Sequence, residues 1–138
     1  MNEDYIKRIN TILQFIDENL DSELSLETVA NIGCYSPFHF HRIFKAITNE
    51  TLNSYITRKR IEKTASVLLH QKNVSITELS LQYGFNSNSS FTRTFKKFYG
   101  LSPSEFRKSK PKYSKIRQVE SKNGQEKGLS EEYICNIN

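Results

Sequence analysis

FHRIFK at residues 40–45 recurs later in the chain as FTRTFK at residues 91–96. Phe, Arg, Phe and Lys keep one offset of 51 residues between the two copies. Residues four positions apart share one face of an α-helix, so Phe40 and Phe44 point together, whereas Arg42 points away from them. The recurrence predicts two helices, each with an aromatic face turned towards a core and a basic face turned outwards.

A shorter apolar segment and a tight turn precede each of these helices, which is the order of a helix-turn-helix unit. The residues concerned are Val29, Ala30 and Cys34 in the first half, and Leu79, Ser80 and Gly84 in the second. The turn needs a residue that tolerates a positive φ angle, and Gly84 meets this need. Cys34 meets it poorly, at a cost of roughly 1 kcal/mol, and we expect the neighbouring Gly33 to take part of the strain.

Capping residues and apolar spacing divide residues 1–110 into about seven helices. Serine or threonine at a predicted start can accept an amide of the first turn, and Pro37 suits the first helical position. No stretch of five or more residues alternates strictly between apolar and polar, so we expect no sheet in this region. The predicted helices cover about 5–20, 25–33, 36–48, 51–70, 75–83 and 87–99, with a last short helix from Ser102.

These helices predict an all-α fold in which a long linker helix joins two helix-turn-helix subdomains. We expect the first subdomain at residues 1–50, the linker helix at 51–71 and the second subdomain at 72–110. Residues 111–138 are polar and charged and cannot bury enough apolar surface to fold alone, so they are interpreted as a linker or tail. Their end alternates weakly at residues 133–137, which suits either the first strand of a missing domain or a disordered end.

Length and composition exclude several classes of protein. The 138 residues suffice for one domain or two small ones. No run of about 18 apolar residues is present to span a membrane, and residues 1–10 do not resemble a secretion signal. Two cysteines, Cys34 and Cys135, form no disulfide framework. We therefore expect a cytoplasmic protein with no membrane partner.

The net charge of +5 is distributed unevenly along the chain. Residues 1–35 carry a net charge of −5, residues 36–70 carry +4 and residues 71–120 carry +7. Such a local excess of positive charge favours a polyanionic partner, although alone it is weak evidence.

The outward faces of the two repeated helices carry side chains suited to double-stranded DNA. These residues are Phe38, His41, Arg42 and Lys45 in the first helix, with Ser89, Thr92, Arg93 and Lys96 at the positions 51 residues later. An α-helix fits the major groove, where arginine can bind guanine with two hydrogen bonds, while lysine suits phosphate. The linker helix would span roughly 28 Å at ~1.5 Å per residue, close to the ~34 Å between major grooves on one side of DNA.

Several motifs of the second half together resemble the DNA-binding domain of the AraC/XylS family of bacterial transcription regulators, and the likeness covers about residues 5–108. The motifs are Ile76-Thr77-Glu78-Leu79, Tyr83-Gly84-Phe85, Phe91 to Lys96, Gly100, Ser102-Pro103 and Phe106-Arg107. The resemblance implies two helix-turn-helix subdomains joined by a long helix, and a regulator acting on promoter or operator DNA in the bacterial nucleoid. It also implies RNA polymerase as a further partner.

The same resemblance suggests which residues contact base edges. They are Phe38, His41 and Arg42 in the first subdomain, and Asn88, Ser89, Thr92 and Arg93 in the second. Lys45, Lys96 and Lys97 are expected to contact phosphates. The chain departs from the family pattern at Cys34 and Asn49, where glycine is usual. Residues 35–42 resemble a branch that carries a GyrI-like ligand-sensing domain, so a small-molecule effector is expected only through such a missing C-terminal domain.

An alternative hypothesis is a helical protein-interaction adaptor without DNA specificity, which would use the acidic residues 17–27 and an exposed Phe38. An enzyme is not expected, because no glycine-rich phosphate loop or supported nucleophile–base set occurs. No metal or other cofactor is expected either. His39 and His41 diverge on a helix, and with Cys34 they fall short of the four ligands of structural zinc.

Overall fold

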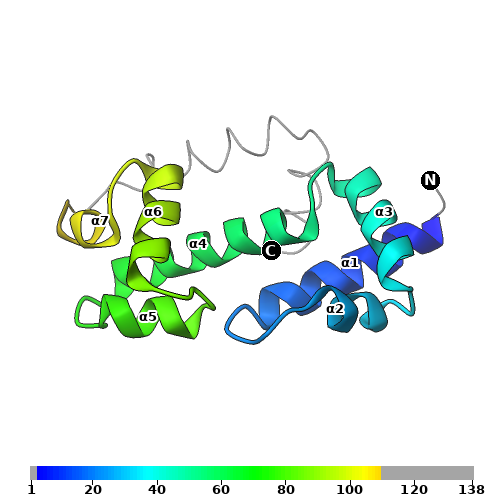
Figure 1. Cartoon of the computed structure of the whole chain (residues 1–138), viewed down its shortest axis with the longest axis horizontal. Helices are drawn as coiled ribbons and strands as arrows, with labels where there is room; N and C mark the ends of the chain where they lie inside the picture. Colours follow the sequence, from blue (N-terminus) through cyan, green and yellow to red (C-terminus); the bar gives the residue numbers. More distant parts are fainter. Residues whose placement is uncertain (1–2, 110–138) are drawn as a thin grey trace. The chain divides into compact units, whose positions relative to one another are not determined.

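The computed structural model describes residues 3–109, and the predicted tail at 111–138 lies outside them. Seven helices and no strand occur in the described part, which confirms the all-α prediction (Figure 1). None of these helices is long and apolar enough to cross a membrane. The helices are α1 (Glu3–Glu18), α2 (Leu26–Ile32), α3 (Pro37–Thr48), α4 (Leu52–His70), α5 (Ile76–Gln82), α6 (Asn88–Tyr99) and α7 (Pro103–Ser109).

Hydroxyl side chains define the starts of most helices. Ser25, Ser36, Ser75 and Ser87 each accept the backbone N–H three residues further on. Thr51 does the same for the N–H of Ser54 at the start of α4. Each bond satisfies an amide that has no partner inside its helix. The starts predicted from these residues are therefore confirmed.

The first helix ends two residues earlier than predicted. The backbone N–H of Asn19 donates to the carbonyl of Ile16 in a tight turn, and its side-chain amide donates to the carbonyl of Phe15. These bonds satisfy carbonyl groups of the last turn, and the helix ends at Glu18. Leu20 is buried nevertheless, so the apolar spacing identified the right inward residue beyond the helix.

The chain divides into two compact units, with the division inside α4 between Thr57 and Arg58. In the first unit, α1, α2 and α3 pack against one another. In the second, α6 packs against α5 and α7. The exact domain boundaries proposed from the sequence remain a prediction.

Aromatic rings form the centre of each unit. In the first, the rings of Phe40 and Phe44 lie 5.4 Å apart, and Phe44 meets Tyr55 at 5.8 Å. In the second, Phe95 contacts Phe91 at 5.8 Å and Phe106 at 5.2 Å. The two phenylalanines of each repeated motif are fully buried, as their spacing predicts.

A third helix belongs to each repeat. The buried residues of α1 are Ile9, Ile12, Leu13 and Ile16, and those at the positions 52 residues later in α4 are Ile61, Thr64, Ala65 and Leu68. Both sets follow the same spacing and all eight residues are buried. The part of α4 from Arg58 onwards thus gives the second unit the buried pattern that α1 gives the first.

Candidate nucleic-acid interface

The turn that precedes α3 and the turn that precedes α6 have the same backbone geometry. Cys34 and Gly84 both lie in the left-handed region, with φ angles of 61° and 83°. The N–H of Cys34 donates to Asn31 at 3.0 Å, and the N–H of Gly84 donates to Leu81 at 3.1 Å. The positive φ predicted for this turn position is therefore present in both halves.

The expectation that Gly33 shares the strain of Cys34 is wrong. Gly33 has a φ angle of −96°, which any residue can adopt, so Cys34 carries the whole left-handed conformation. Space is the physical reason for a glycine at this position. A Cβ atom at Gly33 would lie 2.6 Å from Cδ1 of Ile12, so the buried Ile12 side chain would have to shift to admit a larger residue.

The helices after the turns, α3 and α6, match in length and in both ends. Each has 12 residues and begins after a serine cap, Ser36 or Ser87. Each ends at a left-handed residue, Asn49 with φ 62° or Gly100 with φ 76°. Asn49 thus takes the conformation that the family pattern assigns to glycine, which asparagine tolerates better than most side chains.

The residues proposed for DNA contact lie on the sides of α3 and α6 that the cores leave open. Phe38, His41, Arg42, Lys45, Asn88, Ser89, Arg93, Lys96 and Lys97 are all exposed, and Thr92 is half-buried. Neither helix contains an acidic residue in its first turn to repel a phosphate backbone. The two faces therefore offer cationic and hydrogen-bonding groups around one central arginine each.

On the first face, Arg42 and Phe38 are neighbours one helical turn apart. The Cζ atom of Arg42 lies 5.9 Å from the centre of the Phe38 ring, within cation–π range. His39 turns elsewhere, since its ring lies 5.6 Å from that of Tyr35 and 6.3 Å from that of Tyr5. His39 and His41 thus diverge as predicted, and His39 packs at the helix edge.

On the second face, a side-chain bond links the start of α6 to α5. The amide nitrogen of Asn88 donates to the hydroxyl of Thr77 at 3.4 Å. This contact restricts the Asn88 side chain at the first position of α6. Sequence reasoning singled out Asn88 but not Thr77, because nothing in the spacing alone relates positions 11 residues apart.

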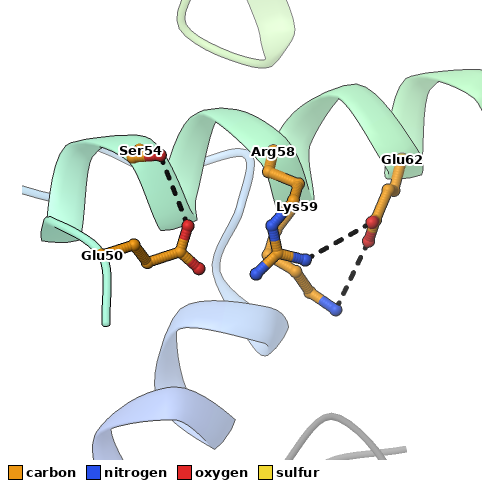
Figure 2. A network of polar contacts seen from close by, with 5 residues as sticks. All are labelled: Glu50, Ser54, Arg58, Lys59 and Glu62. Carbon is orange, nitrogen blue, oxygen red and sulfur yellow. Dashed lines mark hydrogen bonds and ion pairs between the residues drawn. The ribbon is translucent and has the colours of Figure 1, made fainter. Parts of the chain in front are cut away.

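Two cations of the positively charged middle segment are not available to DNA. Arg58 and Lys59 on α4 are buried, and both approach Glu62, at 3.5 Å and 3.6 Å respectively (Figure 2). At the start of the same helix the Ser54 hydroxyl donates to the carboxylate of Glu50 at 3.3 Å, as Figure 2 also shows. The charge distribution of the sequence therefore overstates the basic surface of this segment.

Within residues 3–109, no three histidine, cysteine or acidic side chains are grouped to hold a metal ion. Cys34 is a free and exposed thiol. On the open sides of α3 and α6 the polar groups are hydrogen-bonding side chains and cations.

Comparison with known proteins identifies the family. A model of the helix-turn-helix domain family matches residues 29–109. The Transposon Tn10 TetD protein of Escherichia coli is 42% identical over 102 residues, covering 74% of this chain and 73% of the relative. The HTH-type transcriptional activator AarP of Providencia stuartii is 36% identical over 114 residues, covering 83% and 84%.

The fold comparison agrees with these relatives. A transcriptional regulator of the AraC-type DNA-binding-domain class from Chromobacterium violaceum superposes with a TM-score of 0.71, covering 81% of this chain and 99% of that chain. At 21% sequence identity this likeness shows the fold alone. Membership of a regulator family favours DNA binding over the adaptor alternative. From the matched domain and the relatives together, the chain belongs to the AraC family of helix-turn-helix, DNA-binding transcription regulators.

Proposed function

We propose that α3 and α6 both enter the major groove of one duplex and read its sequence. The observation that carries this proposal is the matched exposure of Arg42 and Arg93. They lie 51 residues apart, each on the open side of a helix that follows a left-handed turn. Two such arginines in equivalent positions are hard to explain as scattered surface charge.

The roles of the side chains follow from their chemistry. Arg42 and Arg93 each donate two hydrogen bonds to a guanine. The remaining base-edge contacts come from Phe38, His41, Asn88, Ser89 and Thr92. The phosphate contacts come from Lys45, Lys96 and Lys97, which fix the register of each helix without reading sequence.

The two helices occupy successive major grooves, so that a single chain does what a dimer of single helix-turn-helix domains usually does. The 19 residues of α4 support this proposal, since they rise by roughly 28 Å, close to one turn of DNA.

Further proposals concern the partners. AarP is a transcriptional activator by name, and we extend to this chain a contact with RNA polymerase at promoters. We also infer action at the bacterial nucleoid in the cytoplasm.

Chemical interference on a selected duplex tests the proposal. A duplex enriched from a random library is treated with dimethyl sulfate, which methylates guanine N7 in the major groove, and bound and free fractions are compared. Arginine needs N7 as an acceptor, so we expect interference in two clusters about 10 base pairs apart. A single cluster would contradict reading by two helices.

A further inference from the structure

The side chain of His39 is oriented by its neighbours at the start of α3. Its ring meets the rings of Tyr35 and Tyr5 in edge-to-face arrangements, with centroids 5.6 Å and 6.3 Å apart. The backbone N–H of His39 donates to the hydroxyl of the cap residue Ser36 at 3.3 Å. The imidazole is nevertheless exposed, and within residues 3–109 neither ring nitrogen takes part in a hydrogen bond or an ion pair. The polar atoms of an oriented ring are thus left to a partner.

His39 lies on the border of the exposed face of α3. Three positions separate it from Arg42, which places it roughly 60° away around the helix. Ile43, on the other side of His39, is buried. When a helix lies in a major groove, its outer face meets base edges, and its borders face the sugar-phosphate strands that form the walls of the groove. The anion closest to this imidazole is then a DNA phosphate.

The charged and titratable groups that face His39 come from α1 and from the segment before α3. On α1, Arg8 lies over the Tyr35 ring, with its Cζ atom 5.3 Å from the ring centre, and it pairs with Asp4 at 3.4 Å. Burial raises the pKa of Tyr35, so its phenol stays neutral near pH 7. The one charged residue of α2, Glu27, lies in the first turn, at the opposite end from the turn that leads into α3.

Histidine is the side chain that ordinarily changes its charge between pH 5 and 8. Carboxyl groups ordinarily titrate below this range, and cysteine, tyrosine, lysine and arginine above it. Protonation of His39 places a new cation beside the first turn of α3, where the positive end of the helix dipole also favours an anion. A phosphate at this border is therefore bound more strongly by the imidazolium than by the neutral ring.

We propose that His39 is a proton-dependent phosphate contact, so that α3 takes up a proton on binding DNA and binds more tightly as the pH falls from 8 to 6. The proton comes from solvent and joins the ring nitrogen that lacks one. This inference rests on the proposed function, in which α3 lies in the major groove. Ser90, 51 residues after His39, is half-buried and does not titrate, so the contact belongs to the α3 half alone.

The test measures binding of the full 138-residue chain to one fluorescein-labelled duplex enriched from the random library. Anisotropy is recorded at pH 8 and pH 6 at constant ionic strength. If the phosphate raises the proton affinity of His39 about tenfold, the wild type gains about fivefold more affinity over this range than H39Q does. H39K, which is cationic at both pH values, should lose this extra gain while keeping the higher affinity.

The other two histidines supply the controls. His70 lies at the end of α4, where its Nδ1 atom is 2.8 Å from the carbonyl oxygen of Ser66. We expect H70Q to keep the full pH response of the wild type. His41 is proposed to contact base edges, so H41Q should bind more weakly at both pH values but keep the extra gain.

Methylphosphonate linkages, which remove the charge of one phosphate at a time, identify the partner of His39. The half-site of α3 is the one whose base preference changes in R42A. Beside it we expect one linkage whose neutralisation reduces the pH response of the wild type to that of H39Q. The same linkage should leave the pH response of H39Q as it was.

The possible failures are distinguishable. An equal pH response in wild type and H39Q would overturn this inference while sequence-specific binding remained. A response that depends on His39 but survives neutralisation of every phosphate beside the half-site would also overturn it, because the contact would not be with a phosphate. Failure to enrich any sequence from the library would overturn the proposed function together with it.

Discussion

The guanidinium of Arg60 lies directly against the turn at Gly84. A Cβ atom at Gly84 would be 2.7 Å from Nη1 of Arg60, and burial of this arginine lowers its pKa. In the first unit Arg8, 52 residues earlier, lies over the ring of Tyr35 with its Cζ atom 5.3 Å from the ring centre. Each unit thus places an arginine of a long helix, α1 or α4, against the segment that leads into α3 or α6.

Substitution of Gly84 by alanine tests this packing. Gly100→Ala is the matched control, because Gly100 has a similar φ of 76° but nothing within 4 Å of an added Cβ atom. We expect G100A to lower the free energy of unfolding by about 1 kcal/mol through left-handed strain alone. G84A should cost up to about 1 kcal/mol more, because Arg60 must move. Urea unfolding measures both, and equal losses would mean that Arg60 does not restrain the turn.

Cys34 is expected to be a site where glycine stabilises the protein. Its φ of 61° is strained for a side chain, at about 1–2 kcal/mol, while a new glycine costs about 0.4–1 kcal/mol through the unfolded chain. Cys34→Gly should therefore raise the free energy of unfolding by roughly 0.5–1 kcal/mol. Cys34→Ala removes the thiol but keeps the Cβ atom, so an equal gain in C34A would show that strain is not the cause.

The start of α7 predicts a pH dependence of stability. The carboxylate of Glu105 accepts the backbone N–H of Ser102 at 2.9 Å, and the Ser102 hydroxyl accepts the N–H of Glu105 at 3.1 Å. The hydrogen bond from the backbone N–H of Ser102, and after it the interaction of the Ser102 side chain with the carboxylate, lower the pKa of Glu105 below its ordinary 4.5. A lowered pKa means that this stabilisation is complete above pH 4.5 and is lost as the pH falls through the value in the folded state.

Glu105→Gln isolates this effect, because glutamine keeps an acceptor that does not titrate. Thermal unfolding of both proteins above and below pH 4.5 should show a larger loss on acidification for the wild type than for E105Q. Parallel losses in the two proteins would assign the acid sensitivity to other carboxylates.

Lys97 is expected to contribute affinity without specificity. It is an exposed cation in the last turn of α6. Loss of one phosphate contact reduces the slope of log K against log salt by about 0.9. Lys97→Ala should therefore weaken binding to selected and random duplexes alike, as salt titrations by fluorescence anisotropy will measure. A change in base preference without a change in salt slope would contradict the phosphate role.

Much of the fold could be predicted because its signals are local. Serine caps set the helix starts, and the spacing of phenylalanines set the buried faces of α3 and α6. The third helix of each repeat was missed for a physical reason. Ile12 and Leu13 correspond to Thr64 and Ala65, so only the burial pattern is shared and the residue types differ.

The charges of α4 could not be interpreted from sequence alone. Arginine and lysine on a helix usually indicate a solvated face, yet Arg58 and Lys59 are buried near Glu62. Their burial depends on tertiary packing, which no local pattern records. The exposed faces of α3 and α6 were easier to predict from the sequence. Once the phenylalanines of a helix are assigned to the core, the residues on the opposite side of that helix must face outwards.

Base preferences of the two arginine variants test the central claim most directly. Selection from a random duplex library is performed with wild type, R42A and R93A, both substituted residues being exposed. We expect each variant to lose discrimination at one guanine, at about 1–3 kcal/mol, with the two affected positions about 10 base pairs apart. If either variant selects the same sequence as the wild type with the same affinity, the account of two reading helices is wrong.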